Sequence, residues 1–247
     1  MVTIHAKDFA YVAPDTVPSG MVTFNLINDG PSFHHATIFR IDSGKTMADL
    51  LAALRNPGPP PTWAVPIGGP NAPAPGSTSD ATLNLAPGNY AILCLVDIPG
   101  GVPHFMKGME HAFTAVAPGG ATTSAAVAPT ADIDVTMKDY GYTFSKPLTA
   151  GHHVFAVTNS GPQVHEIEMV KLDSGKTVED LTKWMMKPVG PPPGQPIGGV
   201  AAEVPGRTAY FSANFTAGNY VSMCLVSDAK DGKPHLMHGM ELLQNVN

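Results

Sequence analysis

Cysteine, histidine and methionine recur in one order at two places in this chain of 247 residues. The stretch CLVDIPGGVPHFMKGME begins at Cys94, and the stretch CLVSDAKDGKPHLMHGME begins at Cys224. The sequence contains no other cysteine. Thiolate, imidazole and thioether groups are ligands for soft or borderline metal ions, so the repetition indicates a metal site in each half of the chain.

A further histidine precedes each cysteine and follows a turn between two predicted strands. It is His34 in the first half and His165 in the second. One thiolate, two neutral imidazoles and a weak thioether form a ligand set that suits copper, and a β-sandwich can bring the loops that carry them together at one end. Zinc also accepts cysteine and histidine and stays an alternative. The candidate ligands are His34, Cys94, His104 and Met109 in the first half, and His165, Cys224, His235 and Met240 in the second.

Each candidate ligand also has an ordinary structural role open to it. A lone buried cysteine usually packs as a small apolar residue, and methionine often fills a gap in a core. The recurrence of four residue types in one order, across loops that otherwise differ, favours the metal. A disulfide between Cys94 and Cys224 is less favoured, because equivalent positions in separate repeats rarely lie within the roughly 7 Å that the Cα atoms of a disulfide require. We therefore expect two free thiols.

The candidate ligands belong to a repeat that covers the whole chain. The upstream histidines are separated by 165 − 34 = 131 residues, the cysteines by 224 − 94 = 130 and the downstream histidines by 235 − 104 = 131. This period exceeds the roughly 20 to 50 residues of solenoid repeats, so each copy is a whole domain. We expect one domain at 1–120, a linker at 121–131, where alanine and threonine replace apolar alternation, and a second domain at 132–247.

The elements that must position these side chains are mainly strands. The 25 glycines and 25 prolines indicate many turns, as in a β-sandwich. Alternating apolar and polar residues predict strands over 20–29 and 34–41, and over the equivalent stretches of the second repeat. One helix follows in each repeat. Thr46 with Asp49 forms a capping box before an apolar stripe, and Thr177 with Asp180 repeats it.

A proline-rich segment follows each predicted helix, at 56–76 and at 187–206. Proline lacks an amide donor, so neither segment can be a helix or a central strand. Both contain the sequence Pro-Ile-Gly-Gly, at Pro66 and at Pro196, and this repetition favours an ordered surface excursion. The fold class predicted is all-β, with two tandem Greek-key sandwiches that each carry one short helix and one such excursion.

At these motifs the sequence resembles the cupredoxin (type-1 blue copper) family over nearly all of both halves. The motifs are Gly-Asn-Tyr-x-x-x-Cys, ending at Cys94 and Cys224, His-x-x-x-Gly-Met, and the Asn-x-Gly-Pro-x-x-His turns. The resemblance implies cupredoxin-like sandwiches in which the two histidines, the cysteine and the methionine of each half bind copper. It implies one ion per domain, with occupancy of a single domain as an alternative.

Two departures from the family pattern concern the surroundings of the ligands. Nine or ten residues separate each cysteine from the downstream histidine, as in copper nitrite reductases rather than small electron carriers. The family usually has asparagine after the upstream histidine, tying the two ligand loops together, whereas this chain has His35 and Glu166. Loss of such a tie can weaken a metal site, so a degenerate site in one or both domains stays an alternative.

The residues beside each cysteine bear on catalysis. In copper nitrite reductases and multicopper oxidases a histidine next to the cysteine binds the catalytic copper, but here the neighbours are Leu93 and Leu95 in one half, Met223 and Leu225 in the other. No second copper with an open coordination position is expected, and hence no enzyme. The leading prediction is an electron-transfer protein. The alternatives are a copper carrier or buffer, and a copper-free interaction module that uses the proline-rich segments as its surface.

The charge and hydropathy of the whole chain argue against nucleic-acid-binding and membrane-spanning proteins. A net charge of −6 with 14% charged residues does not suit nucleic-acid binding, and no apolar run is long enough for a membrane span. The chain starts on a strand-like stretch rather than a leader, and the resemblance implies a periplasmic or extracellular protein. The sequence does not identify the redox partner and leaves homo-oligomerisation open.

Among the other histidines, His238 alone has a claim to function; the rest, His5, His35, His111, His152 and His153, are expected to be structural or on the surface.

Overall fold

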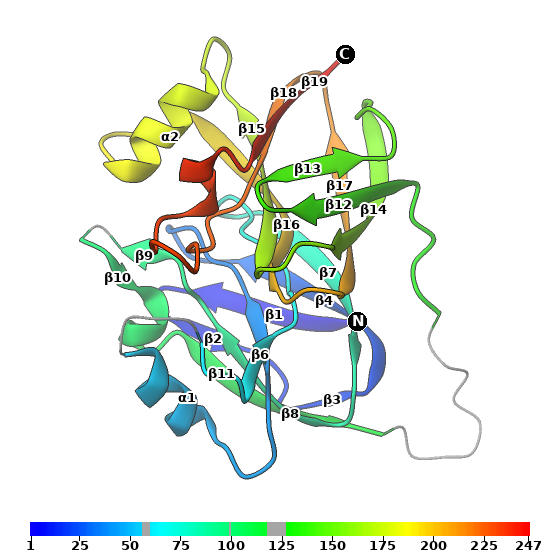
Figure 1. The fold of residues 1–247 in the computed structure, drawn as a ribbon, viewed down its shortest axis with the longest axis vertical. Coiled ribbons are helices and arrows are strands. Elements are labelled where there is room, and N and C mark those ends of the chain that lie inside the picture. Colours follow the sequence, from blue (N-terminus) through cyan, green and yellow to red (C-terminus); the bar gives the residue numbers. More distant parts are fainter. Residues whose placement is uncertain (56–59, 99, 118–126) are drawn as a thin grey trace.

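The computed structural model describes residues 1–55, 60–98, 100–117 and 127–247. Two β-sandwiches follow one another along the chain, and each carries one α-helix (Figure 1). The prediction of an all-β fold is therefore confirmed. The expected linker, 121–131, lies partly outside the described residues, so the domain limits at 1–120 and 132–247 stay predictions.

The first sandwich consists of two sheets. One has the strand order β7-β4-β1-β2 and is part of a larger sheet, and the other has the order β3-β11-β8-β5-β6. Consecutive strands repeatedly change sheet, as in Greek-key sandwiches. The strands are β1 (Val2–Lys7), β2 (Ala10–Val12), β3 (Thr16–Pro18), β4 (Gly20–Asn28), β5 (Thr37–Ile41), β6 (Ala64–Pro66), β7 (Thr78–Leu85), β8 (Gly88–Leu93) and β11 (Glu110–Val116), with a short hairpin of β9 (Asp97–Ile98) and β10 (Val102–Pro103).

The second sandwich repeats this plan. Its sheets have the orders β13-β12-β14-β17 and β16-β15-β18-β19. The strands are β12 (Ile133–Lys138), β13 (Gly141–Phe144), β14 (Gly151–Asn159), β15 (His165–Leu172), β16 (Gly194–Glu203), β17 (Thr208–Phe215), β18 (Gly218–Met223) and β19 (Glu241–Val246). A single-turn 3-10 helix precedes the last strand of each domain, η1 (His104–Lys107) and η2 (His235–His238).

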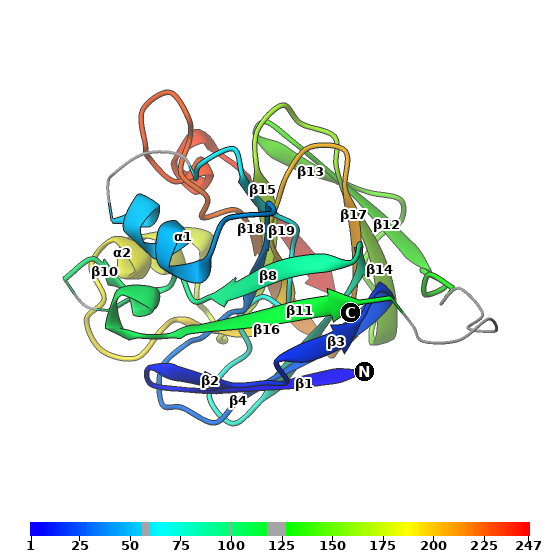
Figure 2. The ribbon, with the colours of Figure 1, turned by 90° about the horizontal axis from the view of Figure 1, so that it is seen from below.

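Strand β8 is buried on both faces, and this determines where the helix lies. Tyr90 and Ile92 point into the main core between the sheets. Ala91 and Leu93 point the other way, into a second cluster that includes Leu50 of α1 (Met47–Leu54). The capping box at Thr46 starts α1 as predicted, and α2 (Val178–Met186) starts in the same way at Thr177. Both helices lie on one flank of the molecule (Figures 1 and 2). Within the described ranges, neither is long and apolar enough to cross a membrane.

The prediction of surface excursions is wrong for the second part of each proline-rich segment, whereas residues 187–191 are exposed and residues 56–59 lie outside the described residues. Residues 67–74 of the first domain run antiparallel to 197–203 of the second, with bridges at Ile67 to Glu203, Pro70 to Val200 and Pro73 to Ile197. Most residues of both stretches are buried. As expected for proline, β6 and β16 lie at the edges of their sheets. Each edge is covered by the other domain, so the segments form the domain interface.

The interface extends into the sheets themselves. Strands β7 and β17 meet at Thr82 and Tyr210 and join the two domains into one eight-stranded sheet. The hydroxyl and backbone N–H of Ser212 donate to the carboxylate of Asp80 across this junction. Within the first domain, the segment lies so close to the residues before β5 that position 69 requires glycine: φ is 141° there, and a Cβ atom would overlap the carbonyl oxygen of Ala36.

Candidate metal centres

In the first domain, three of the four predicted ligands lie together at one end of the sandwich. His34 lies in the loop before β5, Cys94 directly follows β8, and His104 opens η1. The Sγ atom of Cys94 is 3.4 Å from Nδ1 of His104 and 4.0 Å from Nδ1 of His34. The two Nδ1 atoms are 3.1 Å apart. All three side chains are buried, so the structure brings together the donors that the sequence proposed.

The fourth predicted ligand, Met109, is also buried and packs in the same core cluster as Cys94. It follows Gly108, whose left-handed backbone ends η1 and reverses the chain. The backbone N–H of Cys94 donates to the carbonyl oxygen of Met109, and the N–H of Phe105 donates to the carbonyl of Cys94. These bonds hold the cysteine, histidine and methionine of the loop in one unit.

The second domain repeats this geometry closely. Cys224 Sγ is 3.4 Å from Nδ1 of His235 and 4.0 Å from Nδ1 of His165, and the two Nδ1 atoms are 3.0 Å apart. Met240 is buried, and its carbonyl oxygen accepts from the N–H of Cys224. The two centres therefore have the same form, although the loops between their ligands differ in sequence and length.

The protonation states of these groups fit a bound cation. Burial raises the pKa of the Cys94 thiol to about 11 and that of Cys224 well above its ordinary value. Burial also lowers the pKa of His104, to about 4, with a smaller contribution from His34. Neutral imidazoles are available as ligands, and an uncompensated thiolate would be costly. A soft metal ion at the meeting point of Sγ and the two Nδ1 atoms would supply the missing positive charge.

Two carboxylates that the sequence analysis missed orient the upstream histidines. Asp8 Oδ1 is 2.6 Å from Nε2 of His34, and Asp139 Oδ1 is 2.5 Å from Nε2 of His165. Burial alone would raise the pKa of Asp8, but hydrogen bonds from Ser32 and His34 lower it below its ordinary value. With the Nε2 proton held by the carboxylate, Nδ1 is left as the acceptor that faces the cysteine. The repeat register could have found these residues, since 139 − 8 = 131.

The prediction that His35 and Glu166 fail to tie the ligand loops is wrong. Nε2 of His35 accepts from the N–H of Leu95, the residue after Cys94, at 2.8 Å. Glu166 Oε1 accepts from the N–H of Leu225, the residue after Cys224, at 3.0 Å. Both side chains are buried, and His35 is therefore more than an ordinary structural or surface histidine. What the tie needs is an acceptor atom within reach, and imidazole and carboxylate provide one as asparagine does.

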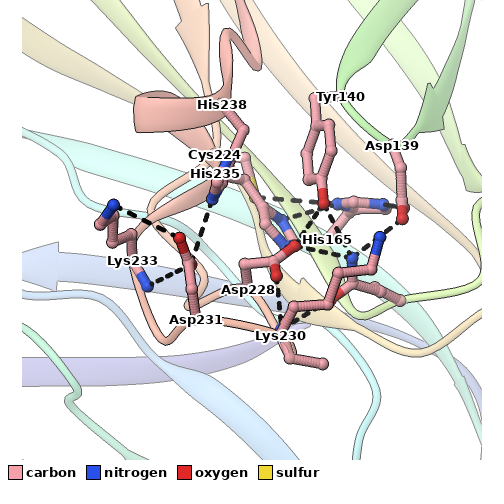
Figure 3. A network of polar contacts seen from close by, with 12 residues as sticks. Asp139, Tyr140, His165, Cys224, Asp228, Lys230, Asp231, Lys233, His235 and His238 are labelled. Atoms are coloured by element: carbon pink, nitrogen blue, oxygen red, sulfur yellow. Dashed lines mark hydrogen bonds and ion pairs between the residues drawn. The ribbon is translucent and has the colours of Figure 1, made fainter.

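The second centre has a polar cover (Figure 3). The Tyr140 hydroxyl and the Gln163 amide donate to Oδ2 of Asp228, and these bonds lower the pKa of Asp228. Asp228 Oδ2 lies 3.6 Å from Nε2 of His235. His238 stacks on Tyr140 and pairs with Asp231 at 3.2 Å, which places it beside the centre as predicted. The first domain has Phe9 at the position of Tyr140, packed edge-on against His104.

Neither cysteine forms a disulfide, so the prediction of free thiols is confirmed. The side chains that flank Cys94 and Cys224 are leucine and methionine. Among the described residues, the groups of donor atoms close enough for one metal ion are the two centres and the set Asp228, Asp231 and His238.

Comparison with known proteins gives structural similarities only. No family profile matches the sequence, and no curated protein matches it. Reduced auracyanin from Roseiflexus castenholzii is 24% identical and covers 46% of this chain and 94% of its own, with a TM-score of 0.33. Copper nitrite reductase from Nitrosomonas europaea is 15% identical and covers 99% of this chain and 92% of its own, with a TM-score of 0.29. A multicopper oxidase is 12% identical over 100% of this chain and 87% of its own, with a TM-score of 0.28.

At these TM-scores the similarities do not define what this chain does. The fold and the donor groups of the chain itself define a two-domain β-sandwich with one candidate metal centre in each domain. The predicted β-sandwich fold, with a histidine, a cysteine and a second histidine as a donor group in each half, is confirmed at this level. Each sandwich brings a histidine, a cysteine and a second histidine together at one end.

Proposed function

We propose that each domain binds one copper ion and that the protein transfers electrons. The observation that carries the proposal is the convergence of one Sγ and two Nδ1 atoms, all buried, at equivalent places in both domains. Cys94 and Cys224 would supply thiolate, His34, His104, His165 and His235 imidazole, and Met109 and Met240 a weak axial thioether.

Bound copper would supply a one-electron couple between Cu(I) and Cu(II). The chain contributes rigidity. Asp8 fixes the ring of His34, His35 fixes the loop after Cys94, and backbone bonds hold Met109 and His104 to the same loop. Donors held in one arrangement need little reorganisation when the charge of the ion changes. This property suits electron transfer more than storage, and it makes the carrier or buffer the second candidate.

No catalytic role is proposed. Substrate activation needs a metal with an open position, and the residues next to the two cysteines are apolar. The copper-free interaction module is the weakest alternative, because residues 67–74 and 197–203 of the proline-rich segments that would form its surface are mostly buried between the domains. Free thiols survive in an oxidising space best when a metal covers them, so a periplasmic or extracellular location fits the proposal.

Titration of the metal-free protein with Cu(II), followed by visible spectroscopy and by metal analysis, tests the proposal. We expect two copper ions per chain and an intense thiolate-to-copper charge-transfer band. Cys94→Ser and Cys224→Ser, made separately, should each remove one ion and leave the other. A chain that binds Cu(I) tightly but shows no reversible couple would be a carrier. Unchanged metal content in both variants would overturn the ligand assignment.

A further inference from the structure

A continuous chain of hydrogen bonds connects the two candidate centres through the domain interface. It starts at the N–H of Leu95, which donates to Nε2 of His35 at 2.8 Å. Nδ1 of His35 is 3.3 Å from Oδ1 of Asn71. Asn71 Nδ2 donates to Oε2 of Glu166 at 3.4 Å, and Oε1 of Glu166 accepts from the N–H of Leu225 at 3.0 Å.

A single assignment of donors and acceptors accounts for every hydrogen bond in this series. A backbone N–H can only donate, so Nε2 of His35 is an acceptor, and the proton of the neutral ring is on Nδ1. Nδ1 then donates to the amide oxygen of Asn71, whose NH₂ group donates to the carboxylate of Glu166. Glu166 accepts at both oxygens. Every link is satisfied by one assignment of protons, and no link competes with the next.

The residues at both ends of this hydrogen-bonded path are covalently joined to the candidate ligands. Leu95 follows Cys94 and His35 follows His34. On the other side, Leu225 follows Cys224 and Glu166 follows His165. The residues that tie the ligand loops of each domain are thus the same residues that reach across the interface, and the connecting path contains one side chain that belongs to neither centre, Asn71.

Asn71 is held firmly at this place. It is 2% exposed, its backbone N–H donates to the carbonyl of Gly199, and its carbonyl accepts from the hydroxyl of Ser79. Its side chain also donates to the carbonyl of Ile167. The position has no polar copy in the second repeat, where residue 71 + 130 = 201 is alanine. A single asparagine serves both domains.

We propose that His35, Asn71 and Glu166 form an electron-transfer bridge between the two copper ions. In each event Cu(I) in one domain is oxidised to Cu(II) and Cu(II) in the other is reduced to Cu(I), so one electron crosses and no proton leaves the bridge. The proposal rests on the proposed function, because it needs copper in both domains. It adds an internal redox equilibrium to that function, and it makes Asn71 a positioning residue for both centres.

Two variants break the bridge at different links. Asn71→Ala copies the residue of the second repeat and removes the middle link. His35→Asn keeps an acceptor beside Leu95 but is too short to reach Asn71. Asn84→Ala, an exposed position of the first domain, is the matched control. In the metal-free protein we expect the amide proton of Leu225 to exchange about tenfold faster in Asn71→Ala, the factor for one hydrogen bond of about 1.4 kcal/mol, and no change in Asn84→Ala.

The decisive measurement is the internal electron-transfer rate. The charge-transfer bands of the two centres are first separated with Cys94→Ser and Cys224→Ser, and the potentials of every variant are measured. Pulse radiolysis of the fully oxidised protein then adds less than one electron per chain, and redistribution between the bands is followed. We expect a concentration-independent phase that is absent from both cysteine variants. It should be at least severalfold slower in Asn71→Ala and in His35→Asn at equal driving force, and unchanged in Asn84→Ala.

Each outcome separates the two proposals. If the wild-type protein binds no copper or only one ion, the proposed function fails and the bridge fails with it. If two ions bind but redistribution is absent, or is equally fast in Asn71→Ala and His35→Asn, the bridge is refuted while the proposed function stands. If one variant does not fold, the other still decides.

Discussion

Replacing Asp8 by asparagine tests how the first centre is held. Asp8 Oδ1 lies 2.6 Å from Nε2 of His34, and the aspartate side chain is 24% exposed. Asparagine preserves the size and an acceptor oxygen but removes the charge. A hydrogen bond to a charged group contributes about 1.5 to 3 kcal/mol and a neutral one about 0.5 to 1.5 kcal/mol, and partial exposure places both contributions at the lower end of their ranges. We expect the difference, a loss of about 1 kcal/mol, which corresponds to roughly fivefold in copper affinity.

The assay is a competition titration of Cu(I) against a coloured chelator. Both proteins carry Cys224→Ser, so only the first centre reports, and Asp8→Asn is compared with its parent in that background. Asp29→Asn provides the matched control. Asp29 pairs with His5 at 2.7 Å in the same domain, but both groups are substantially exposed and neither bonds a candidate ligand.

The reasoning fails if Asp8→Asn binds copper as tightly as its parent. It also fails if Asp29→Asn weakens binding by the same factor, because the effect would then come from the net charge of the domain and not from the orientation of His34. Asp139→Asn in a Cys94→Ser background should repeat the result at the second centre, where the corresponding distance is 2.5 Å.

Three further predictions concern stability of the metal-free protein. Burial raises the pKa of Glu168 well above its ordinary 4.5, so the folded chain keeps a proton that the unfolded chain releases. Relative to Glu168→Gln, the wild type should lose up to about 1.4 kcal/mol per pH unit as pH rises above 4.5, measured by urea unfolding. Gly69→Ala should lower the stability by more than about 1 kcal/mol, whereas Gly88→Ala, with a similar φ of 150° and open space, should cost less. Leu50→Ala should cost about 2 to 5 kcal/mol.

Each of these has an outcome that contradicts it. A pH profile of Glu168→Gln parallel to that of the wild type would show that the carboxyl is ionised in the folded chain. Equal melting temperatures for Gly69→Ala and Gly88→Ala would show that backbone strain, and not the contact with the neighbouring carbonyl, sets the cost. A loss below about 1 kcal/mol for Leu50→Ala would mean that α1 adds little to the stability of its sheet.

The candidate ligand sets could be proposed from sequence because each depends on local patterns. The turn before His34 is closed within seven residues by Asn28, whose side chain bonds Ser32 and Gly30, and the loop from His104 to Met109 is one helical turn ended by glycine. Such patterns appear directly in the residue order. The helix α1 could be predicted for the same reason, because its apolar stripe and capping box are local sequence patterns.

The surroundings of the centres depend on partners far apart in the chain. Asp8 follows β1 and meets His34, 26 residues further along the chain, and a single aspartate carries no local signature. The tie made by His35 was misjudged because a residue type was expected where only an acceptor atom is needed. The proline content of the two segments correctly excluded a helix and a central strand. The residues that pair with each segment lie about 130 positions away in the sequence, so neither segment alone indicates what covers the edge of its sheet.

The pairing of those segments has a symmetry of its own. Pro70 faces Val200, and 200 − 70 = 130, the same separation as between the two cysteines. Each of these residues therefore faces its own copy. Ile67 to Glu203 and Pro73 to Ile197 are likewise exchanged when the repeats are exchanged. Self-matching contact of this kind is the property of a twofold homodimer interface.

A gene duplication that fused two subunits of such a dimer would leave this arrangement within one polypeptide. In a homodimer every substitution appears twice, so an asparagine could not face the axis from one side and an alanine from the other. Fusion removes that restriction. Under such an origin, the differences between His35 and Glu166, and between Asn71 and Ala201, would become accessible only once the halves could change separately, and these residues lie where the two domains meet.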